Sequence, residues 1–248
     1  MSGHSKWATI KHKKGAVDKA RAKLFAKLAR QIEVAAREGG GHIDANATLR
    51  TMVQKAKQGQ MTNDAIDRAI KRGTGEATGA NYESITYEGY APGGVALLID
   101  VLTDNRNRTG SDVRSIFSKL GGAMAEPGAV AWQFKRRGLV YVDGSAGEDD
   151  IVMAALDAGA DDVVRDGDSW RVMTPPSVVW GVRDALEAAG LTVSSAESTM
   201  VSDTSIEVTD VTTARNVLKV LEALEDHDDI QDVYGNFEMS DELMEAAS

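Results

Sequence analysis

Apolar and basic side chains recur at helical spacing through the first third of the chain. Residues 16–38 contain no proline and no glycine and are rich in alanine, leucine and lysine, which predicts one long helix ending at the glycines of residues 39–41. With about 100° between successive residues, apolar side chains share one arc of this helix and cations share another. The apolar arc holds Val17, Leu24, Phe25, Leu28 and Ile32, and the cationic arc holds Lys19, Lys23, Lys27, Arg30 and Arg37.

Two shorter helices are predicted next. One is expected over residues 46–58, and the other from an N-capping Asn63 to Arg72, just before Gly73. The short connection between them resembles a helix-turn-helix, but Asp64 and Asp67 stand where a recognition helix would meet bases. Because carboxylates repel phosphates, this pair of helices is not expected to read a base sequence.

After residue 81 the pattern changes to short apolar runs separated by turns. Strands are expected over residues 82–90 and 95–102, joined by the turn-forming segment Ala91-Pro92-Gly93-Gly94. A helix is expected from Thr109, with Asp112 completing a capping box, and a further strand over residues 130–134.

Residues 139–199 contain a complete motif of their own. Their pattern predicts strand, helix, strand, strand, helix, strand, which is the order of a ferredoxin-like domain. The segments on either side, taken together, give the same order, with residues 82–90 as an extra strand. The expected elements of the inner block are 139–142, 148–158, 162–165, 169–173, 177–189 and 191–198, and those of the flanks begin at residues 95, 109, 130, 204, 211 and 229.

We therefore predict an α+β multidomain fold, in which a three-helix domain precedes two ferredoxin-like α/β domains, one inserted into the other. The helical domain is expected over residues 1–78. The discontinuous domain is expected over residues 79–136 and 202–240, the inserted domain over residues 137–201, and an acidic, solvated tail over residues 241–248.

Charge divides the chain at about residue 76. Residues 1–76 carry 16 Lys and Arg against 7 Asp and Glu, a net charge of +9, whereas the whole chain has a formal net charge of -10. The remaining residues therefore sum to -19. A basic module on an acidic body indicates a polyanionic partner for the first segment, although lysine-rich helices also serve solubility.

The basic segment begins with an arm, SKWATIKHKK at residues 5–14. Its lysines suit phosphates and carry little base information, while Trp7 either stacks on an unpaired base or pins the arm to the helical core. We predict that the nucleic-acid contacts are Lys6, Trp7, Lys11, His12, Lys13, Lys14, Lys19, Lys23, Lys27, Arg30, Asn105, Arg106 and Arg108. The acidic C-terminal segment either keeps the body away from nucleic acid or meets a basic protein surface.

The last three of these contacts lie in the loop TDNRNRTG, residues 103–110. Two guanidinium groups just before a helix N-terminus favour an anion, but the same residues also suit a polar turn that caps its helix. A second basic cluster, Lys135-Arg136-Arg137, is either a further phosphate contact or a solvated hinge.

Residue types for catalysis are sparse. The chain has no cysteine, and its four histidines are far apart in sequence, so we expect neither a metal site nor a cofactor. Asp100 and Asp104, with Glu88 and Asp112 as neighbours, could bind magnesium for phosphodiester hydrolysis, but a turn at Asp104 and a helix cap at Asp112 are the stronger explanation of these carboxylates. The sequence therefore favours a non-enzymatic protein. With no apolar run of membrane-spanning length, it is expected to be cytoplasmic and to have no membrane partner.

Several stretches resemble one known family. These are GHSKWATIKHKK (residues 3–14), GGGHIDANATL (39–49), AIDRAIKRGTGE (65–76), YEGYAPGGVALLID (87–100), LTDNRNRTGSDVR (102–114) and the two glycines before AVAWQFKRRG (129–138). They are similar to the YebC/PmpR family, also called the TACO family after its mitochondrial translational activator. Residues 123–127 depart from the expected small-residue stretch, and the inserted block has little motif content.

The resemblance implies a cytoplasmic protein with a helical N-terminal domain and two α/β domains. It also implies a role in gene expression. Some members are described as DNA-binding transcriptional regulators, and others as ribosome-associated factors that bind ribosomal RNA and relieve stalling at proline-rich stretches. Both descriptions agree with nucleic-acid binding without catalysis.

Overall fold

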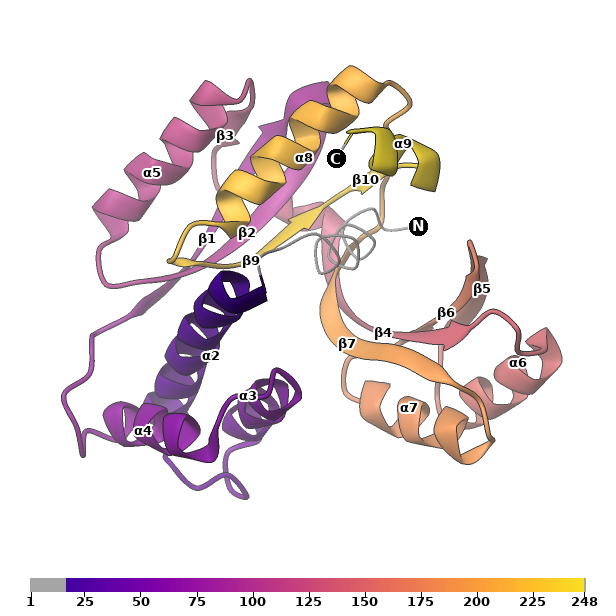
Figure 1. Cartoon of the computed structure of the whole chain (residues 1–248), viewed down its shortest axis with the longest axis horizontal. Coiled ribbons are helices and arrows are strands. Elements are labelled where there is room, and N and C mark those ends of the chain that lie inside the picture. Colours follow the sequence, from indigo (N-terminus) through magenta and orange to yellow (C-terminus); the bar gives the residue numbers. More distant parts are fainter. Residues whose placement is uncertain (1–16, 248) are drawn as a thin grey trace.

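The computed structural model describes residues 17–247, without the side chains of residues 17–20 and 241 (Figure 1). Three helices come first, followed by two four-stranded sheets with helices packed on them. This arrangement confirms the predicted α+β fold of N-terminal helices followed by sheet-containing domains. Among the described helices, none combines the length and the hydropathy that a membrane crossing requires.

The helical domain consists of α2 (Val17–Gly39), α3 (Ala47–Gln58) and α4 (Asn63–Gly73). Part of the predicted apolar arc of α2 lies in the core of this domain: Leu28 and Ile32 are buried, and Phe25 packs against the same core. Leu24, also assigned to the arc, is 40% exposed. The predicted N-cap of α4 was wrong by one residue. Thr62 caps the helix, because its hydroxyl accepts a hydrogen bond from the Ala65 amide at 3.3 Å.

Asn46 joins α2 to α3. Its side-chain amide donates to the carbonyls of Ala35 at 2.7 Å and Gly40 at 2.9 Å, and its Oδ1 accepts from the Leu49 amide at 3.0 Å. A Cβ on Gly39 would lie 2.5 Å from the Asn46 amide nitrogen. The glycine run therefore makes room for this one buried side chain, which caps α3 and fixes the turn.

The first sheet has the strand order β3-β1-β2-β9, and α5 and α8 cover one of its faces (Figure 1). Its apolar core lies between that face and the two helices, and includes Ile99, Phe117 and Leu221. The elements are β1 (Glu83–Ala91), β2 (Val95–Thr103), α5 (Arg106–Lys119), β3 (Ala123–Ala125), α8 (Val211–Glu225) and β9 (Ile230–Gly235).

Two predicted strands of this sheet were wrong. Residues 131–133 form a 3₁₀ turn, η2 (Ala131–Gln133), and β8 (Ile206–Glu207) pairs with β10 (Phe237–Glu238) in a separate two-stranded sheet. Strand β1 takes the inner position instead. The turn η1 (Pro92–Gly94), with Gly93 and Gly94 at positive φ, brings β1 and β2 together as a hairpin, so the local pairing forms in preference to a distant one.

The acidic tail is also more ordered than predicted. Helix α9 (Asp241–Ala247) packs against α8 and buries Met244 and Ala247 in the core of the first sheet. The interpretation of residues 241–248 as a solvated tail was therefore wrong for this helix.

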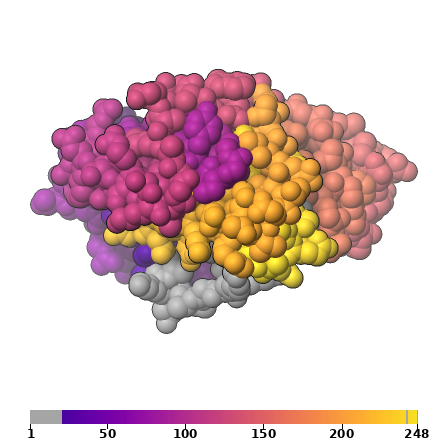
Figure 2. Space-filling view, turned by 90° about the horizontal axis from the view of Figure 1, so that it is seen from above, coloured from indigo at the N-terminus to yellow at the C-terminus, as the bar shows by residue number. Residues whose placement is uncertain are grey.

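The second sheet has the order β5-β6-β4-β7, with every neighbouring pair antiparallel. This is the ferredoxin-like order predicted for the inner block, and α6 and α7 cover one face. The block lies at one end of the molecule (Figure 2). Its elements are β4 (Phe134–Asp143), α6 (Glu148–Asp157), β5 (Asp162–Asp166), β6 (Ser169–Thr174), α7 (Val179–Ala188) and β7 (Val193–Ser202).

Candidate nucleic-acid interface

The cationic arc of α2 faces the acidic body. Lys23 Nζ lies 3.1 Å from an Asp226 carboxylate oxygen and 3.0 Å from the carbonyl oxygen of the same residue. Lys27 Nζ donates to the Glu225 carbonyl at 2.8 Å. These acceptors belong to residues 225–229, which comprise the last residue of α8 and the segment leading to β9 and which we call the acidic turn. The C-terminal end of α8 adds its own partial negative charge to those carboxylates.

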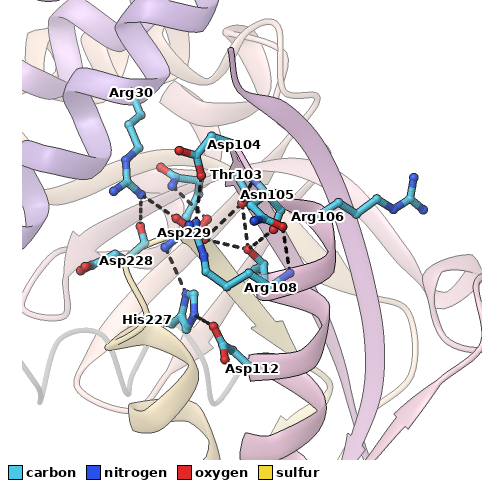
Figure 3. A network of polar contacts seen from close by, with 12 residues as sticks. Arg30, Thr103, Asp104, Asn105, Arg106, Arg108, Asp112, His227, Asp228 and Asp229 are labelled. Carbon is cyan, nitrogen blue, oxygen red and sulfur yellow. Dashed lines mark hydrogen bonds and ion pairs between the residues drawn. The ribbon is translucent and has the colours of Figure 1, made fainter. Parts of the chain in front are cut away.

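Arg30 completes the contact one turn along α2. Its guanidinium donates to the Asp228 carbonyl and lies 3.4 Å from an oxygen of Asp229 (Figure 3). The same guanidinium lies over the ring of Tyr82, 5.8 Å from its centroid. The predicted cationic face therefore exists for the described residues 23–30, and in this structure it binds oxygen atoms of the protein itself.

Asp229 is the centre of the network on the other side of the turn (Figure 3). Its Oδ2 accepts from the Thr109 hydroxyl and from Arg108, both at 2.7 Å, and lies 3.2 Å from the Thr103 hydroxyl. Burial on its own would raise the pKa of Asp229, but the hydrogen bonds from Arg108 and Thr109 hold that pKa below its ordinary value. The carboxylate is therefore charged in the folded protein at neutral pH.

The start of α5 differs from the prediction. The helix begins at Arg106, and Asn105 caps it by accepting from the Arg108 amide at 3.1 Å. The capping box of Thr109 and Asp112 was wrong, because Thr109 lies inside the helix, while Asp112 lies 3.2 Å from His227 Nε2. The sequence placed the cap too late because Asn105 and Thr109 are both residues that favour a cap.

The three anion contacts predicted in the loop of residues 103–110 differ from one another in their surroundings. Asn105 is used as the cap, and Arg108 bridges Asp229 and Asp104, the latter at 2.9 Å. Arg106 is exposed and points away from the network (Figure 3). The polar-turn interpretation thus describes Asn105 and Arg108, whereas Arg106 extends outward.

A cleft of about 630 Å³ lies between α2, the start of α5 and the acidic turn. Three cations and four carboxylates line it, so it is a site of paired charges. The cations are Lys23, Arg30 and Arg108, and the carboxylates are Asp104, Asp226, Asp228 and Asp229.

The carboxylates suggested for magnesium are not assembled. Asp104 lines this cleft, whereas Asp100 lines a second cleft of about 640 Å³ beside Arg136 and accepts from the Thr86 hydroxyl at 3.0 Å. Glu88 lines the same cleft as Asp100, but its carboxylate accepts the backbone amides of Gly128, Val130 and Ala131. Within residues 21–247 no group of three or more His, Cys, Asp or Glu side chains has a metal-binding arrangement.

Most of the predicted arm lies outside the described residues. Lys6, Trp7, Lys11, His12, Lys13 and Lys14 precede the described range, and Lys19 lies in α2 with its side chain outside it. For these residues, nucleic-acid contact stays a prediction.

Sequence reasoning missed the internal partner of the α2 cations. The signal was present, since the acidic turn EDHDD at residues 225–229 is the densest run of carboxylates that follows a predicted helix. What sequence spacing could not supply was the long-range packing that brings residue 23 beside residue 226.

Family models match nearly the whole chain. Residues 5–76 match the TACO1/YebC protein N-terminal domain, and residues 82–237 match the TACO1/YebC second and third domain. A relative from Rubrobacter xylanophilus is 56% identical over 98% of both chains. Another, from Halothermothrix orenii, is 52% identical over 99% of this chain and 98% of its own. Both are named "Probable transcriptional regulatory protein".

A solved structure has the same fold. The crystal structure of a conserved hypothetical protein from Aquifex aeolicus superposes with a TM-score of 0.80 at 42% identity, covering 95% of this chain and 98% of its own. The chain belongs to the TACO1/YebC family.

Proposed function

We propose that this protein is a non-enzymatic, nucleic-acid-binding regulator of gene expression that holds phosphates through its basic N-terminal domain. DNA is the first candidate partner, because relatives at 52–56% identity are named transcriptional regulatory proteins. The observation that carries the proposal is the cationic face of α2, where Lys23, Lys27 and Arg30 already hold carboxylate and carbonyl oxygens. Phosphate oxygens present the same kind of acceptor.

The acidic turn and a nucleic acid compete for these cations under this proposal. Lys23 cannot keep its 3.1 Å contact with Asp226 and also bind a phosphate with the same hydrogen atoms. Binding then begins at the arm, whose lysines at positions 11, 13 and 14 precede α2 in the chain, and spreads to α2 as the turn withdraws.

The test compares two triple variants with the same change in net charge. The arm variant Lys11→Glu, Lys13→Glu, Lys14→Glu changes the predicted contact, and the control Lys119→Glu, Arg215→Glu, Lys219→Glu changes exposed cations of α5 and α8. Fluorescence anisotropy measures the affinity for promoter fragments between about 50 and 200 mM salt.

The arm variant should bind at least about 10-fold more weakly, and its slope of log K against log salt should be shallower by about 0.9 for each phosphate that the arm no longer neutralises. The control should bind only slightly more weakly than wild type. Equal reductions in both variants would show that only net charge matters, and a wild-type protein without affinity for any promoter fragment would exclude DNA as the partner.

Ribosomal RNA is the second candidate, with a role in relieving stalling at proline-rich stretches. One observation favours it: Asp64 and Asp67 are exposed at the start of α4, where they would repel a duplex read through its bases. Contacts directed at phosphates and shape suit RNA equally. Crosslinking in cells, followed by sequencing of the bound DNA and RNA, separates the two, and unchanged ribosome pausing in a deletion strain would exclude the translational role.

A further inference from the structure

Trp132 is more exposed than any other large apolar side chain described, with 69% of its surface open to solvent. It lies in the 3₁₀ turn η2, outside every predicted contact. Its indole Nε1 donates to the Ala129 carbonyl at 3.1 Å, and the Tyr90 hydroxyl, 39% exposed as a residue, lies 3.5 Å from the same oxygen. Two exposed aromatic rings therefore meet at one carbonyl, each held at its polar edge.

The loop that carries Trp132 is fixed from below by a buried charge. Glu88, only 6% exposed, accepts the amides of Gly128, Val130 and Ala131 at 2.5, 2.6 and 2.8 Å. Burial would raise the pKa of Glu88, but these backbone hydrogen bonds lower it, so the carboxylate stays charged. The loop therefore fixes the edge of the Trp132 ring through its Nε1 hydrogen bond and leaves most of the ring surface open to solvent, where a flat ligand can reach it.

We propose that Trp132, with Tyr90 beside it, is a stacking platform for an unpaired base of a single-stranded nucleic acid. This inference rests on the proposed function and adds a second contact outside the basic domain. An aromatic ring held at its edge with open faces loses little conformational freedom when a base stacks on it. Such stacking tolerates any base, because every base has a π face.

Charge next to the platform favours a nucleic acid over a peptide. Lys135 and Arg136 follow in β4 and are both exposed. Lys135 forms an ion pair with Asp203 in which both side chains are about half exposed, whereas Arg136 lines the neighbouring cleft together with the carboxylates Glu88, Asp100 and Asp232. An exposed pair of this kind is weak and can exchange its carboxylate for a phosphate, so Lys135 can hold the backbone of a nucleotide whose base lies on Trp132.

The test uses the full chain and a fluorescein-labelled uridine decamer, with a labelled duplex of the same length as a second probe. Trp132→Ala removes the platform and Trp132→Phe keeps a ring. Met153→Ala is the matched control, because Met153 is 65% exposed on α6 but is not aromatic. Thermal melting of each variant verifies that the fold is intact.

Trp132→Ala should weaken binding of the decamer by about 5- to 100-fold, the loss expected for one stacked base, and should leave duplex binding unchanged. Trp132→Phe should stay within about threefold of wild type, and Met153→Ala should match it. Saturation with decamer should also quench wild-type tryptophan fluorescence by more than it quenches Trp132→Phe.

Other outcomes overturn the proposal at different levels. If wild type binds the decamer and Trp132→Ala binds it equally well, the platform is wrong while the proposed function stands. Equal reductions for decamer and duplex would mean that Trp132 does not stack on unpaired bases. If wild type binds neither probe, the proposed function and the platform both fail.

Discussion

Asp229 shows at the scale of one residue how the basic and acidic parts are held together. Its side chain is 8% exposed and accepts from two hydroxyls and a guanidinium of the sheet domain, while Arg30 of the helical domain approaches its other oxygen. Because this carboxylate contacts both the helical domain and the sheet domain, loss of its hydrogen bonds would disturb the packing of the two domains. We expect it to contribute more to stability than its exposed neighbours.

Replacing Asp229 by Asn should lower the free energy of unfolding by about 2 kcal/mol, because hydrogen bonds to a charged acceptor are removed in a buried place. Asp104→Asn is the matched control, since Asp104 contacts the same Arg108 but is 49% exposed and should cost less than about 1 kcal/mol. Urea denaturation at pH 7 measures both. Equal costs would contradict the central position of Asp229.

The same variant predicts a pH dependence. Because the native pKa of Asp229 is lowered, its stabilising effect is complete above the unfolded pKa of about 3.9 and is lost as the pH falls through the native value. The difference in stability between wild type and Asp229→Asn should therefore be constant from pH 7 to 5 and shrink below about pH 4. A difference that grows toward low pH would contradict the assignment.

Among elements, α5 illustrates what the sequence can and cannot specify. Its apolar positions Val113 and Phe117 are buried as predicted. Its start was predicted too late, because the sequence alone does not show which of several polar side chains accepts a hydrogen bond from the amides of the first turn. The order of elements in the inner block was predicted correctly because each of its strands has its own helix or turn beside it, although β4 begins at Phe134 instead of residue 139. The strand at residues 130–134 failed for another reason. Val130 and Phe134 are buried through a 3₁₀ turn, and burial alone does not distinguish a turn from a strand.

Asn105→Ala tests the observed start of α5. Removal of this N-cap should cost about 1 kcal/mol, because the Arg108 amide is left without its acceptor. Asn107→Ala, two residues along and exposed inside the first turn, should change stability by less than about 0.5 kcal/mol. Thermal or urea unfolding gives both values. A larger cost at Asn107 would mean that the helix starts later than Arg106.

The candidate interface was predictable in part. The cationic arc of α2 follows directly from helical spacing, and residues 23, 27 and 30 do lie on one side. Their acidic partner and the Trp132 platform were not predictable, since each depends on contacts between residues far apart in sequence. Glu88 and Ala131, for example, are separated by 43 positions and joined by a 2.8 Å hydrogen bond.

At the scale of the whole molecule, the acidic body contacts the basic helical domain through the negatively charged acidic turn. Asp226→Asn with Asp228→Asn should raise affinity for nucleic acid by about 3- to 10-fold near 0.1 M salt, because the field opposing phosphate weakens. The double variant Asp149→Asn, Asp150→Asn, on the exposed start of α6, has the same net charge and should have little effect. Anisotropy titrations compare them, and the difference should vanish near 0.5 M salt. Equal gains would assign the effect to net charge.

The paired strands β4 and β7 have a consequence for how the molecule can be dissected. They pair in register from Phe134 opposite Ser202 to Gly138 opposite Ser198, and β6 joins β4 only from Gly138 onward. Gly138 and Ser198, which flank the rest of the inserted block, are therefore neighbours and are close enough for a two-residue Asn-Gly turn to join them. A shortened chain that runs from Gly138 through such a turn to Ser198 should melt cooperatively and still bind nucleic acid. This result would show that the removed residues are needed neither for folding of the rest of the chain nor for nucleic-acid binding.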